Sequence, residues 1–197
     1  MSAPPAPPLL LASTSPQRRA ILAQLRLPFD VVVPRYEERA ADGVSPAELV
    51  REHALGKARS VANDAGLRPV VGVDTIVHCR GRIFGKPRTA EEAAETLAAL
   101  SGDVHDVVSG LALVTPGWEL VEHDLTRVRF RVLTARDVAG YVAAGEWEGR
   151  AGAYAIQGLG AALVERIEGD YLNVVGLPAA VLVRILAERF AGTYGFG

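Results

Sequence analysis

The chain has 197 residues, of which 49% are hydrophobic, so it can bury a substantial core and general disorder is excluded. Its 21 Lys and Arg residues nearly balance its 23 Asp and Glu residues, which leaves no strong net charge to attract nucleic acid or an anionic membrane. The single cysteine, Cys79, rules out an internal disulfide, and the sequence shows neither a signal peptide nor an apolar run of membrane-spanning length. We therefore expect a cytoplasmic protein with no nucleic-acid partner and no membrane partner.

Apolar periodicity and turn residues predict strands alternating with helices in the first half of the chain and clustered strands in the second half. This order predicts an α/β fold with a mixed, twisted sheet and flanking helices. Residues 1–8 are expected to form a flexible arm and residues 9–197 a single domain. In chain order, the predicted elements are a strand at 9–11, a helix at 16–25, a strand at 27–34, a helix at 45–67, two strands within 69–87, a helix at 89–102, strands at 105–115 and 125–133, a helix at 134–145, a glycine-rich loop at 145–160, a strand at 161–171 and a helix at 178–190.

The turn between the first strand and the first helix is a candidate anion site. Ser15 suits the N-cap position and Pro16 the first helical position, so the helix is expected to begin here. The first N–H groups of a helix lack intrahelical partners and lie at the positive end of its dipole, which favours an anion beside Arg18 and Arg19. An ordinary capped helix with solvated arginines is the alternative interpretation.

Asp74 interrupts an otherwise apolar predicted strand, "VVGVDTIV". An ionised carboxylate buried there without a partner would be strongly unfavourable, so Asp74 requires a cation. Gly72 falls on the same face of the strand and leaves space beside the carboxylate for another group to approach. The alternative interpretation is a structural aspartate that caps a loop or pairs with an arginine.

Two lysines are candidates for binding an anionic substrate. Lys57 falls on the apolar stripe of the predicted helix at 45–67, which places it on the buried face. Its stem alone could be buried, with the amine in water at the rim. Lys86 lies between a glycine and a proline, which fix the chain locally and could present its amine to a phosphate; an exposed lysine in a tight turn is the alternative.

Glu37 and Glu38 follow directly after the second predicted strand. Together with Asp74 they could hold Mg²⁺ or Mn²⁺, which are hard cations that prefer oxygen ligands and also bind substrate phosphates. Solvated acidic residues in a loop are the alternative interpretation.

Seven short motifs occur along the chain in the order "ASTSPQRRAIL", "KARSVA", "GVDTIV", "GKP", "LSGDVHDVVSG", "AGAYAIQGLG" and "GDYLNVVGLP". Together, in this order, they resemble the Maf family of nucleoside triphosphate pyrophosphatases. The resemblance, which is closest to the dTTP/UTP pyrophosphatase branch, implies two lobes around a cleft in a fold of the Maf and inosine-triphosphate-pyrophosphatase type. It also implies a cytoplasmic, house-cleaning hydrolase, often a homodimer, that uses Mg²⁺ or Mn²⁺ to convert a pyrimidine or modified nucleoside triphosphate to the monophosphate and pyrophosphate.

The resemblance assigns roles to particular residues. Asp74 matches the catalytic acid of the family, which is usually assigned as the proton acceptor for the attacking water, and it could also be a metal ligand. The full prediction is catalysis by Asp74, Lys57 and Lys86, metal binding by Glu38 and Asp74, and substrate binding by Ser13, Ser15, Gln17, Arg18, Thr75 and Gln157.

Gln17 departs from the dTTP/UTP branch, which has an arginine at the matching position. We therefore expect the preference for dTTP and UTP that Thr75 and Gln157 imply to be broadened or shifted by Gln17. A second hypothesis, from another functional class, is a protein that senses nucleotide and regulates cell division or septum formation without turnover.

Overall fold

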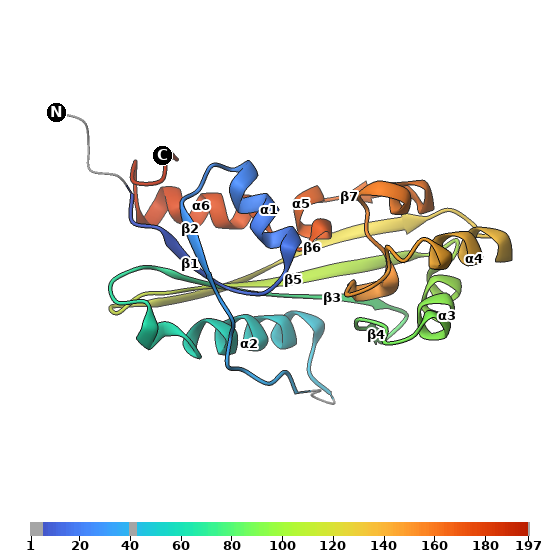
Figure 1. Cartoon of the computed structure of the whole chain (residues 1–197), viewed down its shortest axis with the longest axis horizontal. Helices are drawn as coiled ribbons and strands as arrows, with labels where there is room; N and C mark the ends of the chain where they lie inside the picture. The colour runs from blue at the N-terminus through green and yellow to red at the C-terminus, as the bar shows by residue number, and fades with distance from the viewer. Residues whose placement is uncertain (1–5, 40–42, 197) are drawn as a thin grey trace. The chain divides into compact units, whose positions relative to one another are not determined.

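This computed structural model, which describes residues 6–39 and 43–196, contains a mixed sheet, and the continuous apolar run at residues 9–11 lies in one of its strands. The strands are β1 (Leu9–Ala12), β2 (Phe29–Val32), β3 (Val70–Cys79), β4 (Arg82–Phe84), β5 (Val104–Val114), β6 (Glu119–Phe130) and β7 (Val164–Glu168). β1 is parallel to β2 and β3, whereas the pairs β3–β4 and β6–β7 are antiparallel. Across the described residues the sheet has seven strands, in the order β2-β1-β3-β5-β6-β7 with β4 paired to β3, which confirms the predicted α/β class (Figure 1).

Helices lie between several of these strands along the chain, and the predicted helix start at Ser45 has a complete capping box. The helices are α1 (Pro16–Gln24), α2 (Pro46–Arg59), α3 (Ala90–Leu100), α4 (Ala135–Ala143), α5 (Tyr171–Val175) and α6 (Ala179–Arg189), with short 3₁₀ turns at Ala62–Asp64, Ala151–Ala153 and Gly158–Leu163. The Ser45 hydroxyl accepts a hydrogen bond from the Glu48 backbone N–H, and the Glu48 carboxylate accepts one from the Ser45 N–H, both at 3.2 Å. α2 ends before the predicted residue 67, because Val61 has a φ of −127° and leaves the helical region.

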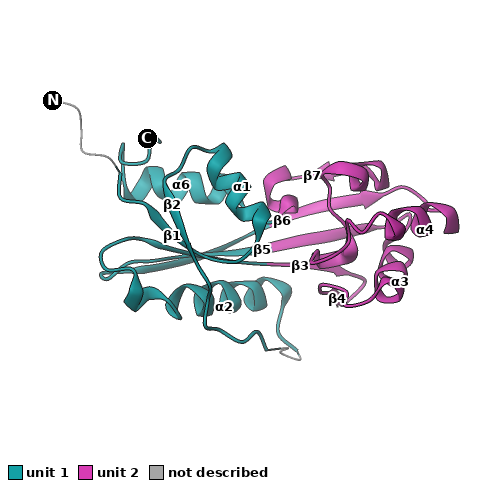
Figure 2. Cartoon of the chain, in the orientation of Figure 1, with its two compact units in different colours: residues 1–74, 109–124, 176–197 teal, residues 75–108, 125–175 magenta. Residues whose placement is uncertain are grey.

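The chain divides into two compact units (Figure 2). Unit 1 comprises residues 1–74, 109–124 and 176–197, and unit 2 comprises residues 75–108 and 125–175. Three of the four boundaries fall within β3, β5 and β6, so these strands contribute residues to both units.

In unit 1, helix α2 lies very close to the sheet. Figure 1 shows α1 and α6 over one face of this part of the sheet and α2 over the other. A Cβ atom on Gly72 of β3 would lie 2.1 Å from the Ala54 carbonyl oxygen, and one on Gly110 of β5 would lie 2.1 Å from the Val50 carbonyl oxygen. Only glycine permits this approach, and it brings the buried face of α2 directly against β3.

Unit 2 has its own core, which is built around the fully buried Phe130. The rings of His105 and Tyr154 meet Phe130 edge-on, with centroids 4.8 Å from it in both cases. His105 Nε2 lies 2.9 Å from the Tyr154 hydroxyl, which gives this buried pair a polar contact.

Part of the predicted arm at residues 1–8 lies outside the described residues, which begin at residue 6. The carbonyl of Pro7 accepts a hydrogen bond of 2.9 Å from the Tyr194 hydroxyl. Within the ranges 6–39 and 43–196, none of the helices combines the length and the apolar character needed to cross a membrane.

Candidate active site

Asp74, on β3 of unit 1, is buried between two basic side chains of α2. It is 5% exposed. Lys57 Nζ donates to Asp74 Oδ1 over 2.6 Å, and His53 Nδ1 lies 3.3 Å from Asp74 Oδ2. The cation that the sequence requires beside Asp74 is therefore Lys57, and the alternative in which the Lys57 amine reaches water is wrong.

These contacts determine the charge of Asp74. Burial on its own raises the pKa of a carboxyl group, because it disfavours the ionised form. The hydrogen bond from His53 and the positive charges of Lys57 and Arg18 outweigh burial and hold the pKa of Asp74 well below its ordinary value. Asp74 is therefore ionised at neutral pH.

Glu38 also bonds to Lys57, although it lies in the segment that follows β2. Lys57 Nζ is 2.6 Å from Glu38 Oε1, and the Glu38 side chain is half-exposed. The segment approaches α2 because Gly56 leaves room for Tyr36, whose ring would lie 2.2 Å from a Cβ atom at that position. One ammonium group thus joins Glu38 and Asp74, the two carboxylates that the sequence predicts as metal ligands.

His53 is a member of this cluster that the sequence analysis missed. His53 is 6% exposed, and its Nε2 lies 3.1 Å from the Arg39 carbonyl oxygen. The hydrogen bond to Asp74 raises the pKa of His53, and burial opposes this effect. The sequence signal that could have identified His53 is its spacing, because it precedes Lys57 by one helical turn and lies on the same buried face of α2.

The predicted anion-binding turn holds Arg18 beside Ser13. Arg18 Nη1 donates to the Ser13 hydroxyl over 3.2 Å, and Arg18 Nε donates to the Gly176 carbonyl over 2.9 Å. Ser15 occupies the N-cap position of α1 but makes no capping hydrogen bond with its side chain. The Ser15 hydroxyl donates instead to Gln17 Oε1 over 3.0 Å.

Three predicted site residues belong to unit 2. Thr75 follows Asp74 directly on β3 and is half-buried. Lys86 lies between β4 and α3, and Gln157 lies immediately before the 3₁₀ turn at Gly158–Leu163; both are exposed. Their assignments therefore stay predictions, while the contacts in unit 1 join Ser13 to Arg18 and join Glu38, Lys57 and Asp74.

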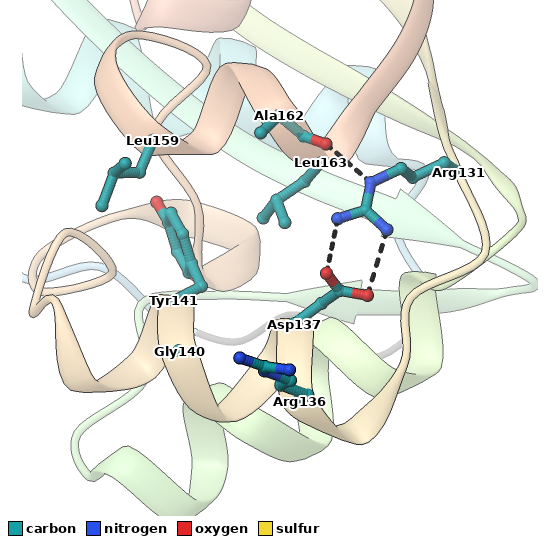
Figure 3. A pocket seen from close by; sticks show the side chains of 8 residues that line it. All are labelled: Arg131, Arg136, Asp137, Gly140, Tyr141, Leu159, Ala162 and Leu163. Carbon is teal, nitrogen blue, oxygen red and sulfur yellow. Dashed lines mark hydrogen bonds and ion pairs between the residues drawn. The ribbon is translucent and has the colours of Figure 1, made fainter.

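A pocket in unit 2 contains none of the predicted site residues (Figure 3). Arg131 lines it, but its guanidinium donates twice to the Asp137 carboxylate, at 3.0 and 2.8 Å, and once to the Ala162 carbonyl at 2.7 Å. This arginine is already neutralised by a bidentate partner, so the pocket offers a weaker case for anion binding than the cluster in unit 1.

An α/β protein with a buried carboxylate, several cations and a helix amino terminus in one unit has the chemistry of a phosphate-processing site. A family model described as "Maf-like protein" matches residues 8–189, and the chain belongs to this family. A dTTP/UTP pyrophosphatase of Moorella thermoacetica is 50% identical over 183 residues, which cover 91% of this chain and 93% of that protein. One of Gloeobacter violaceus is 47% identical over 181 residues, which cover 91% of this chain and 95% of that protein.

Among solved structures, the Ham1 protein of Staphylococcus aureus aligns with 63% of this chain and 72% of that chain, at 14% identity and a TM-score of 0.44. The family assignment rests on the sequence matches alone.

Proposed function

We propose that this protein is a metal-dependent nucleoside triphosphate pyrophosphatase that converts dTTP, UTP or a related pyrimidine or modified nucleotide to the monophosphate and pyrophosphate. The observation that carries the proposal is the buried Asp74 carboxylate, which bonds to Lys57 beside Glu38. Relatives at 42–50% identity that are named dTTP/UTP pyrophosphatases support the same activity. No observation on the described part of the chain favours the regulator without turnover.

The charge balance of the cluster suits a polyphosphate. Arg18, His53 and Lys57 are the basic groups, and Glu38 and Asp74 are the acidic ones. Arg18 and Lys57 balance the two carboxylates, and the hydrogen bond to Asp74 raises the pKa of His53, which favours an additional positive charge and attraction of a triphosphate. Arg18 can donate to phosphate oxygens in a fork, and the first amides of α1 add further donors.

The residues present fit a divalent metal. Glu38, His53 and Asp74 each offer one ligand atom, and these atoms all lie within 4.8 Å of one another. Carboxylate oxygens are the ligands that Mg²⁺ and Mn²⁺ prefer, and we propose that Glu38 and Asp74 supply them. When bound, such an ion neutralises phosphate charge and lowers the pKa of a water molecule.

The role of Asp74 follows from its low pKa. A general base works best when its pKa is near the working pH. The pKa of Asp74 is far below neutral pH while Lys57 and His53 bond to its carboxylate. The ionised carboxylate is suited to binding a cation and to orienting water. We therefore favour a metal-binding and orienting role, with proton acceptance only after its bonds to Lys57 and His53 have been loosened.

The remaining assignments rest on the resemblance. We propose that Lys86 stabilises charge on the departing pyrophosphate and that Thr75 and Gln157 contact the base. Gln17, whose side-chain oxygen accepts from Ser15, is proposed to alter base preference. A cytoplasmic location and a homodimer belong to the same proposal, and light scattering of the purified protein measures the oligomeric state.

A nucleotide panel tests the proposal. Purified protein is incubated with dTTP, UTP, CTP and a purine triphosphate in the presence of Mg²⁺ or Mn²⁺, and the products are separated by ion-exchange chromatography. We expect monophosphate and pyrophosphate in equal amounts. Recovery of diphosphate and orthophosphate would show that water attacks a different phosphorus from the one proposed. If no nucleotide is hydrolysed, the proposed function is rejected.

A further inference from the structure

The ring of His53 lies between two groups that can only accept hydrogen bonds. Nδ1 faces Asp74 Oδ2 at 3.3 Å, and Nε2 faces the Arg39 carbonyl oxygen at 3.1 Å. Because a carbonyl and an ionised carboxylate only accept hydrogen bonds, a ring nitrogen that carries a proton donates to the oxygen it faces. The contact with Arg39 fixes the orientation of the ring, and Nδ1 then faces Asp74.

The two oxygens of Asp74 have different partners on the same helix. Lys57 bonds to Oδ1 and His53 to Oδ2, and the two basic residues lie one turn apart on α2. The close approach of α2 at Gly72 fixes the distance between helix and strand. A carboxylate held at both oxygens cannot rotate about its terminal bond, so its plane is set before any ligand arrives.

We propose that His53 is a positioning residue that holds the plane of the Asp74 carboxylate in its working orientation. The inference rests on the proposed function, because a fixed carboxylate plane matters when Asp74 must bind a metal ion or orient water. Residues that orient metal-binding groups in this way change metal affinity or activity about 10–100-fold when they are replaced.

Two variants separate the two ends of the ring. In His53→Asn the amide nitrogen takes the place of Nδ1 and can still donate to Asp74. In His53→Gln the amide nitrogen takes the place of Nε2 and can bond only to the Arg39 carbonyl. His53→Leu removes both bonds, and His123→Gln, at an exposed position on β6, is the matched control.

Each variant is assayed for steady-state turnover, for binding of Mn²⁺ alone and for thermal unfolding. We expect His53→Asn to stay within about fivefold of the wild type, and His53→Gln and His53→Leu to lose about 10–100-fold in kcat and in Mn²⁺ affinity. The KM for nucleotide should change less than kcat, because His53 does not contact the substrate in this proposal. The control should match the wild type.

Three results would overturn the proposal. His53→Leu with wild-type kcat and Mn²⁺ affinity would show that Asp74 needs no such support. Equal losses in His53→Asn and His53→Gln would point to direct metal ligation by the imidazole, and a lowered melting temperature with unchanged kcat would point to a purely structural role. If the wild type hydrolyses no nucleotide, the proposed function fails separately, and Mn²⁺ affinity across the same variants still decides the role of His53.

Discussion

Replacing Asp74 with asparagine keeps the size of the side chain and removes its charge. In the folded protein, Asp74 is 5% exposed and bonds to Lys57 at 2.6 Å. Removing one member of a buried ion pair costs about 3–5 kcal/mol, because the other charge stays buried without compensation. Lys57 retains Glu38 as a second partner at 2.6 Å, so we expect a loss near the lower end, about 3 kcal/mol.

A loss of that size should be visible in thermal unfolding. For a chain of this length, about 3 kcal/mol lowers the melting temperature by roughly 6–12 °C. Lys57→Met is the matched variant, since it removes the opposite charge of the same pair. The double variant removes both charges. We expect its loss in free energy of unfolding to be smaller than the sum of the two single-variant losses by about 1–3 kcal/mol.

The same asparagine variant should lose turnover. We expect pyrophosphate release to fall at least about 1000-fold when it is assayed well below the melting temperature of the variant. The reason is that asparagine at residue 74 has no negative charge with which to bind a metal ion or accept a proton from water. If the melting temperature of the variant equals that of the wild type, the Asp74–Lys57 ion pair does not stabilise the folded protein. Near-normal turnover in the folded variant would refute the role of Asp74.

Three further predictions concern the metal ion, Gln17 and His105. Chelation with EDTA should abolish pyrophosphate release, and added Mg²⁺ or Mn²⁺ should restore it; turnover that survives chelation would reject the metal. Gln17→Arg loses the acceptor for Ser15 and gains a cation, so kcat/KM for dTTP and UTP should rise relative to CTP and a purine triphosphate, and unchanged ratios would remove Gln17 from base selection. Burial lowers the pKa of His105 to about 4, so the unfolded chain binds the extra proton between about pH 6.5 and pH 4 and stability falls as pH drops through that window. In urea unfolding, the wild type should lose about 3 kcal/mol more free energy of unfolding than His105→Gln as the pH falls through this window. Parallel pH profiles of the unfolding free energy in the two proteins would contradict the prediction.

The sequence predicts unit 1 well where the signal is local. The Ser45 capping box and the apolar strands depend on neighbouring residues, and both are present in the structure. The need for a cation beside Asp74 was predictable from the cost of an unpaired buried charge, and Lys57 was already placed on the buried face of its helix.

Contacts between distant residues were not predictable in the same way. His53 meets Asp74 only because α2 approaches β3 at Gly72, and periodicity along one helix gives no information on which strand it will contact. The early start of β6 at Glu119, against the predicted residue 125, has a similar cause. Four of its first six residues, ELVEHD, are polar and none of the six is buried, so their strand conformation comes from pairing within the sheet rather than from an apolar pattern.

The contacts of Lys57 connect the roles predicted for Glu38 and Asp74. An ammonium group has three N–H donors, and those of Lys57 are directed to Asp74, to Glu38 and, at 3.5 Å, to the Val73 carbonyl. Lys57 can therefore reach a phosphate oxygen only by giving up one of these acceptors. Glu38 is the weakest held of the carboxylates, because its side chain is half-exposed whereas Asp74 is buried. The contact with the Val73 carbonyl is the longest of the three, so we expect a phosphate oxygen to replace that contact first, while Lys57 keeps its pairs with Glu38 and Asp74.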